Sequence, residues 1–191
     1  MIRWIDEVKA VPWAPPQVRT LMISAGHSHT DPGAVANGYR EADLVLEFRD
    51  LVSIELCALG IKHMKDGGKG ENLPLRDAVK VAAKCDLAVE FHTDAAGSSA
   101  TGTWTLSRAH NKPLAAQLCH VTADTLGIRN RGPAPENAGQ HHRLAFVSDG
   151  GGIIHELFFI TNKGDLAAFL GGRRGLAKEV ARVLAEAARQ P

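Results

Sequence analysis

Four side chains of the kinds that bind metals or transfer protons stand where a folded chain could bring them together. His27 and His92 come at the ends of short apolar runs, Glu156 ends another, and Glu41 opens an amphipathic segment. Two imidazoles and one carboxylate are the ligands of some catalytic zinc sites, which leave one coordination position for water. A fourth group, a nearby carboxylate, can take the proton of that water and pass it to a leaving amine. These residues suit amide hydrolysis, although any one alone could be a hydrogen-bonded residue at a strand end.

The segments around these residues predict alternating strands and helices. Apolar runs predict strands over residues 20–25, 61–64, 86–92, 102–106, 144–147 and 152–157, and helical spacing predicts helices over residues 41–59, 74–84, 111–126 and 173–189. This order predicts an α/β fold, a single domain with a twisted, mostly parallel (mixed) sheet flanked by helices on both faces. Ligands of such sheets bind beyond the carboxyl ends of the strands, where the candidate residues fall.

The chain of 191 residues suits one domain. The prolines at positions 12, 15 and 16 predict an N-terminal arm over residues 1–19, ahead of a catalytic domain over residues 20–191. Residues 130–143 are rich in Gly, Pro, Asn and His, which predicts a long loop. His141 and His142 in this loop either line the cleft or are solvated.

Composition argues against several classes of partner. The formal net charge of +1 argues against a nucleic-acid partner, and the absence of a long apolar run argues against stable membrane insertion. Cys57, Cys85 and Cys119 lack CxxC or CxxH spacing and are expected to be reduced and mostly buried. Residues 1–17 lack the apolar stretch of a secretory signal, so we expect synthesis in the cytoplasm.

Other histidines are expected to have structural or surface roles. His155 precedes Glu156 in a predicted strand, so the two side chains face opposite sides. If Glu156 faces the cleft, His155 should be a buried, hydrogen-bonded structural residue. His63, His110 and His120 lack a metal-like setting and are expected on the surface or on helices.

Several segments, in order, carry the motifs of one family. Residues 26–34 (GHSHTDPGA) resemble its GHxxxDPGA opening, and residues 41–44 (EADL) resemble the EKDL start of its first helix. Residues 86–95 (DLAVEFHTDA) resemble its aspartate, strand and SIHANA segment, and residues 130–132 match its NRG turn. Residues 154–162 (IHELFFITN) resemble its VExGFISN strand and turn. From about Leu21 to its C-terminus the chain therefore resembles the zinc-dependent N-acetylmuramoyl-L-alanine amidases of type 3, including phage endolysins.

The resemblance implies a role for each of the four candidate residues. His27, Glu41 and His92 would bind zinc, and Glu156 would be the catalytic carboxylate. His29, at a variable position of the motif where the family usually has glycine, lies two residues from His27 and is the alternative metal ligand.

The remaining candidates are expected around the metal or the substrate. Asp31 and Asp94 would hydrogen-bond to the ligand imidazoles or cap turns, and Arg131 of the NRG turn would lie near the substrate. The chain departs from the motifs at Thr93-Asp94, which replaces Ala-Asn, and at Phe158, which replaces a glycine. These departures bear on the substrate more than on the metal ligands.

The function implied by the resemblance is zinc-dependent hydrolysis of the amide bond between N-acetylmuramic acid and L-alanine in peptidoglycan, leading to cell-wall lysis. We expect the protein to act on the wall after release from the cell, as a monomer. Two alternatives are a zinc peptidase of the peptidoglycan cross-link and a non-catalytic module that binds muropeptides. Another divalent ion with similar ligand preferences would fit the same residues.

Overall fold

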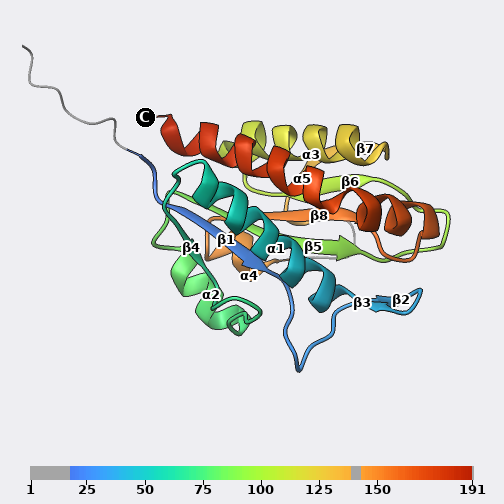
Figure 1. The fold of residues 1–191 in the computed structure, drawn as a ribbon. Coiled ribbons are helices and arrows are strands. Elements are labelled where there is room, and N and C mark those ends of the chain that lie inside the picture. Colours follow the sequence, from blue (N-terminus) through green and yellow to red (C-terminus); the bar gives the residue numbers. More distant parts are fainter. Residues whose placement is uncertain (1–17, 139–142, 191) are drawn as a thin grey trace, which may run out of the picture.

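A single mixed sheet forms the centre of the molecule (Figure 1). The computed structural model describes residues 18–138 and 143–190, and within them six strands pair in the order β4-β1-β5-β8-β6-β7. Their bounds are β1 Leu21–Ala25, β4 His63–Lys65, β5 Leu87–Asp94, β6 Thr103–Leu106, β7 Asn130–Ala134 and β8 Ile153–Phe159. Strands β4, β1, β5 and β8 run parallel, whereas β6 pairs antiparallel with β8 and parallel with β7. The predicted mostly parallel, mixed sheet is confirmed.

Helices cover both faces of this sheet, as predicted. Figure 1 shows α1 (Glu41–Ala58), α3 (Lys112–Leu126) and α5 (Lys163–Arg189) on one face, and α2 (Leu75–Ala82) and α4 (Ala145–Ser148) on the other. A 3₁₀ turn, Ala109–Asn111, precedes α3, and the short strands β2 (Val35–Ala36) and β3 (Tyr39–Arg40) form a hairpin just before α1. Among the described residues, no helix has the length and apolar character that a bilayer crossing requires.

Alternation along the central strands divides the core into two apolar clusters. Ile23 of β1 packs under α1 and α5, whereas Met22 faces the cluster beneath α2 and α4. In the larger cluster the Phe48 ring of α1 lies 5.0 Å from that of Phe91 in β5, and Phe158 stacks on Phe169 at 4.6 Å. Because both clusters pack on the same strands, the carboxyl ends of β1, β5 and β8 are held rigidly side by side.

Two predicted elements are wrong in type. The apolar run 144–147, predicted as a strand, forms the short helix α4, because a four-residue apolar run has no periodicity that separates the two structures. The predicted loop 130–143 begins with strand β7, which contains Gly132 and Pro133. Proline is tolerated there because β7 is an edge strand, where an N–H is not needed on the open side.

Two further differences lie on the α5 side. Helix α5 begins ten residues earlier than predicted, at Lys163 rather than Arg173, because the Asn162 side chain caps it by accepting from the N–H groups of Gly164 and Asp165. Gly171, Gly172 and Gly175 hide the helical pattern of this first half from the sequence. Cys57 was expected to be buried but is exposed on α1, whereas Cys119 is buried.

Two predictions concern residues that the structure does not describe. Of the predicted arm, only residues 18 and 19 are described, and the Arg19 N–H donates to the Ala188 carbonyl at 2.8 Å. His141 and His142 lie outside the described residues. The boundary between arm and domain therefore stays a prediction.

Candidate metal centre

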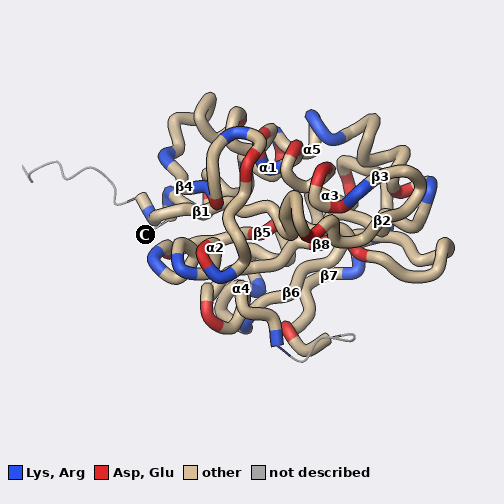
Figure 2. Tube along the Cα trace, turned by 90° about the horizontal axis from the view of Figure 1, so that it is seen from below, with Lys and Arg blue, Asp and Glu red and all other residues tan. Residues whose placement is uncertain are grey.

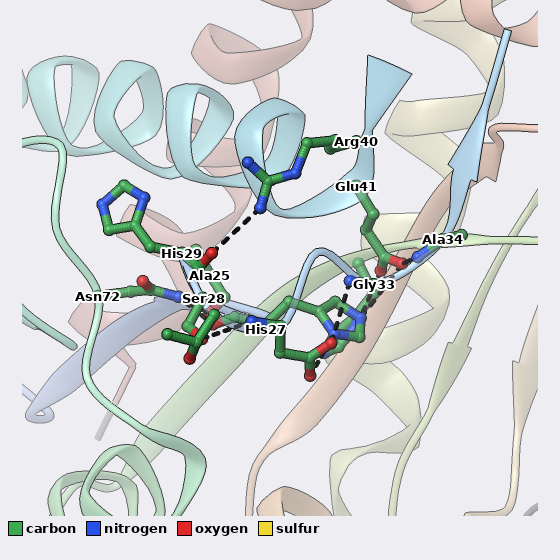
Figure 3. A network of polar contacts seen from close by, with 12 residues as sticks. Ala25, His27, Ser28, His29, Gly33, Ala34, Arg40, Glu41 and Asn72 are labelled. Carbon is green, nitrogen blue, oxygen red and sulfur yellow. Dashed lines mark hydrogen bonds and ion pairs between the residues drawn. The ribbon is translucent and has the colours of Figure 1, made fainter. Parts of the chain in front are cut away.

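His27 occupies a tight turn directly after β1. Its backbone has φ of 64°, unusual for a residue other than glycine, and its carbonyl accepts a hydrogen bond from the Asn72 side chain. The ring Nδ1 lies 3.0 Å from Asp31 Oδ2, and Nε2 lies 3.1 Å from Glu41 Oε2. Burial lowers the pKa of His27, but the hydrogen bond with Glu41 and the negative charge of Glu41 outweigh burial, so the pKa is raised. Figure 3 shows the His27 ring directed toward Glu41.

Glu41, the first residue of α1, is buried between the two imidazoles. Its Oε2 accepts from the Ala34 N–H at 2.9 Å, and its Oε1 accepts from the Thr93 N–H at 2.9 Å. Burial would raise the pKa of Glu41, but hydrogen bonds with His27 and His92 hold the pKa well below its usual range. The N-terminal position on the helix also favours the ionised carboxylate.

His92 lies near the end of β5 with both ring nitrogens next to carboxylates. Nδ1 is 3.0 Å from Glu41 Oε1, and Nε2 is 3.0 Å from Glu90 Oε1. The His27 and His92 rings meet edge to face, 5.0 Å apart. Burial lowers the pKa of His92, but the hydrogen bonds with Glu41 and Glu90 raise it well above its ordinary value.

Two glycines make this close approach sterically feasible. A Cβ on Gly26 would lie 2.2 Å from the His92 ring, and a Cβ on Gly33 would lie 2.6 Å from both Glu41 and His27. Gly33 also has φ of 64°, which favours glycine. Any larger residue at these positions would force the ligand side chains apart.

The donor set fits a metal cation. One ligand atom from each of His27, Glu41 and His92 lies within 4.8 Å of the others, so these three predicted ligands are brought together. The raised pKa of both imidazoles shows that the cluster attracts positive charge, which a cation can supply in place of the protons. Two nitrogens and one carboxylate oxygen are a set that zinc accepts with a free position.

Glu156 lies beside His92 on the neighbouring strand, as the pairing of the two residues in β5 and β8 shows. Its side chain is buried, and within residues 18–138 and 143–190 its Oε2 has no hydrogen-bond partner. Burial raises the pKa of Glu156 to about 8, with further contributions from Glu41 and Asp94. A buried carboxyl group with an unpaired oxygen beside a cation site is placed to exchange protons with a ligand there.

The structure separates the four remaining candidates into two groups. The first group lies near His27. The Asp31 carboxylate contacts the His27 ring, whereas the exposed His29 side chain points away from it (Figure 3). The His29 carbonyl accepts a hydrogen bond from Arg40 at 3.3 Å. The second group meets at Trp104, which is not among the residues predicted from the sequence. Asp94 accepts from Trp104 Nε1 at 2.8 Å, and the Arg131 guanidinium lies 5.9 Å from the same ring.

Trp104 connects this second group to the candidate metal centre. It pairs with Glu156 across β6 and β8, so Asp94 and Arg131 lie on the Glu156 side of the centre. In the described residues, the side-chain hydrogen bonds of Asp94 run to Trp104 and to the N–H of Ala95 rather than to an imidazole.

Sequence reasoning missed Glu90, the carboxylate that contacts His92 Nε2. It is 3% exposed, and its other oxygen accepts from the Ser24 hydroxyl at 2.9 Å. The available signal was the spacing of two residues, because residues i and i+2 of a strand share a face. Glu90 and His92 also line a cavity of about 310 Å³, together with His27 and apolar side chains that include Leu73, Leu75, Leu144, Phe146 and Ile154.

The histidines given structural roles behave differently from the pair at the centre. His155 is fully buried, and its Nε2 contacts the hydroxyls of Thr122 at 3.2 Å and Thr103 at 3.3 Å, as expected for a hydrogen-bonded structural residue. Burial lowers its pKa to about 3. His63 lies in β4 and contacts the Ser53 hydroxyl, whereas His110 and His120 are exposed.

Charges are distributed around the whole fold. Figure 2 shows Lys and Arg spread over the outside of the molecule, whereas acidic segments also lie in its middle, at β5 and β8.

The sequence profile of the N-acetylmuramoyl-L-alanine amidase family matches residues 21–186. The chain belongs to this family. A solved structure from Neisseria meningitidis, assigned as an N-acetylmuramoyl-L-alanine amidase, is 42% identical and superposes with a TM-score of 0.80 over 88% of this chain and 95% of that one. The family, the fold and the amidase class predicted from the sequence are thereby confirmed.

Two curated relatives of this amidase are longer proteins. The amidase LytC of Bacillus subtilis is 29% identical over 76% of this chain and 30% of its own length. The endolysin of Bacillus phage SPP1 is 26% identical over 78% of this chain and 58% of its own length. The chain therefore spans about a third of the first relative and somewhat over half of the second.

Proposed function

We propose that this amidase uses zinc to hydrolyse the bond between the lactyl group of N-acetylmuramic acid and the L-alanine of the stem peptide. The proposal rests on one observation above all. One ligand atom from each of three side chains lies within 4.8 Å of the others, beside the buried carboxyl group of Glu156, whose Oε2 is unpaired among the described residues. His27, Glu41 and His92 would hold the ion. When bound, zinc supplies Lewis acidity, which polarises a carbonyl and makes water more acidic.

The side chains of this protein would do the remaining work. Glu156 would take a proton on its unpaired Oε2 from the attacking water and return it to the nitrogen of the leaving L-alanine. A nearby cation lowers the pKa of a carboxyl group, so Glu156 would be ionised in the loaded enzyme although its pKa is raised to about 8 without metal. The cavity beside His27 and His92 offers room for part of the substrate.

The test is digestion of purified peptidoglycan by the zinc-loaded protein, followed by identification of the new amino termini. Free stem peptides beginning with L-alanine are expected. Cut cross-links would instead indicate a peptidase, and wall binding without any cleavage would indicate a non-catalytic module.

A variant separates proton transfer from metal binding. Glu156→Gln removes the proton acceptor but keeps the side-chain volume, so we expect cleavage to fall by about 10²–10⁴-fold. Zinc content, measured by atomic absorption, should stay near one ion per chain. Cleavage at the wild-type rate would contradict the role of Glu156.

The place of action is also part of the proposal. We infer that the protein is made in the cytoplasm, reaches the wall after release and works as a monomer. Cell fractionation tests the two points on location, and light scattering of the purified protein tests the monomeric state.

A further inference from the structure

Glu90 is a buried carboxylate with both oxygens engaged. It lies in the middle of β5, 3% exposed, in register with Ser24 of β1 and Ile154 of β8. Its Oε1 lies 3.0 Å from His92 Nε2, and its Oε2 accepts from the Ser24 hydroxyl at 2.9 Å. Burying a charged group is costly unless it is paired and hydrogen-bonded, so this carboxylate depends on those two partners.

The contact with Glu90 gives the Nε2 of His92 an acceptor apart from Glu41. A neutral imidazole has one N–H and one lone pair. When Nε2–H donates to Glu90, the lone pair is on Nδ1, which faces Glu41 at 3.0 Å and thus the ligand cluster. Without this acceptor, the neutral ring could carry its single N–H on Nδ1 instead, or it could rotate within the cavity that it lines.

We propose that Glu90 is a positioning residue that holds His92 with its Nδ1 lone pair aimed at the metal, and that Ser24 holds Glu90 in turn. This inference rests on the metal site of the proposed function. The family segment SIHANA has serine at this position, where this chain has Glu90. Such outer partners of a ligating histidine contribute about 10–100-fold to metal affinity.

The decisive experiment measures zinc affinity by competition with a chromophoric chelator. Glu90→Ala is expected to weaken zinc binding by about 10–100-fold. Glu90→Gln is nearly isosteric and keeps one oxygen acceptor, so it should restore part of this affinity. Ile154→Ala is the matched control, because Ile154 is the cross-strand neighbour of Glu90 in the same cavity, and it should stay within about threefold of wild type.

A second readout reports on His92 itself. In the cobalt-substituted protein, the Nε2–H proton of His92 should give a shifted NMR signal that exchanges slowly with solvent, because it is held by a buried acceptor. In Glu90→Ala this signal should broaden or disappear, whereas Ile154→Ala should retain it. Ser24→Ala should give an intermediate exchange rate, since Glu90 then loses one partner.

The outcomes separate this inference from the proposed function. If the wild type binds no zinc, or if His92→Ala binds as tightly as wild type, the metal site itself is wrong. If the wild type binds zinc and His92→Ala does not, but Glu90→Ala and Glu90→Gln keep wild-type zinc affinity and the slow N–H signal, only the role of Glu90 is overturned. A variant that binds zinc normally but has a raised KM would place Glu90 against the substrate and likewise refute the inference.

Discussion

His27 and His92 face the same carboxylate, but the protein holds their rings by different means. His27 lies in an irregular turn with φ of 64°, and the Asp31 side chain behind its ring is 65% exposed. His92 lies on a central strand, and the Glu90 side chain behind its ring is 5% exposed and bonded to Ser24. Water competes less for the second hydrogen bond than for the first, because Glu90 is much less exposed than Asp31, so we expect His92 to be the more rigid of the two rings.

The largest effect is expected from removing each ring in turn. Both His92→Ala and His27→Ala should lose stoichiometric zinc and cleavage, because a ligand is missing. Only His92→Ala leaves the buried Glu90 and Glu41 without a shared partner. The free energy of unfolding of its metal-free form should therefore be lower than that of metal-free His27→Ala, by about 3 kcal/mol.

Denaturant unfolding in the presence of a chelator measures this difference in stability. Equal losses of unfolding free energy in the two variants would show that the two rings are held equally strongly. Full zinc retention by His92→Ala would refute its assignment as a ligand.

A smaller but still large effect is expected at Gly26. In Gly26→Ala the new Cβ would lie 2.2 Å from the His92 ring, which cannot move aside without losing Glu41 or Glu90. We expect the free energy of unfolding to fall by about 1–3 kcal/mol, with weaker zinc binding. Gly97→Ala is the control, since a Cβ there meets nothing within 4 Å. Unchanged zinc affinity in Gly26→Ala would show that the His92 ring is mobile.

Among the described residues, His155 is a buried histidine without a carboxylate partner and serves as a reference. Its burial should make the stability of the folded protein depend on pH. Its folded pKa is lowered to about 3 from 6.5, so between these values the unfolded chain binds a proton that the folded protein does not. Its contribution to stability is therefore fully present above pH 6.5 and is lost as the pH falls toward 3.

The loss should amount to at most about 1.4 kcal/mol per pH unit, as judged by comparing the wild type with His155→Gln. Chelator-treated samples should be compared by thermal unfolding at a series of pH values. Parallel pH profiles for the two proteins would contradict this assignment.

The smallest effect is expected at the exposed partner. Asp31→Asn keeps an oxygen that can accept from His27 Nδ1 and removes a charge that is mostly solvated, so zinc affinity should fall by less than about threefold. The chelator competition assay used for Glu90 measures it directly. A loss for Asp31→Asn as large as that for Glu90→Ala would show that burial does not distinguish the two rings.

Much of this site could be predicted from the sequence because the motifs carry the relevant residues. His27, Glu41, His92 and Glu156 were singled out by type and position, and the structure brings the first three together and places the fourth beside His92. Their roles in metal binding and catalysis stay predictions. Glu90 was missed although it lies on the same strand face as His92.

The sequence by itself determined most strands and helices, because apolar periodicity reflects which side of an element is buried. It did not determine α4 and β7, because a short apolar run and a proline-containing edge strand depend on their neighbours for their structure.

Only the tertiary structure decided which nitrogen of each ring faces Glu41 and which hydroxyl group holds Glu90. Those contacts join residues that are far apart in the chain, 66 positions for Ser24 and Glu90 and 51 for Glu41 and His92. No local pattern encodes such distances, because they arise only when the strands pair and α1 packs against them.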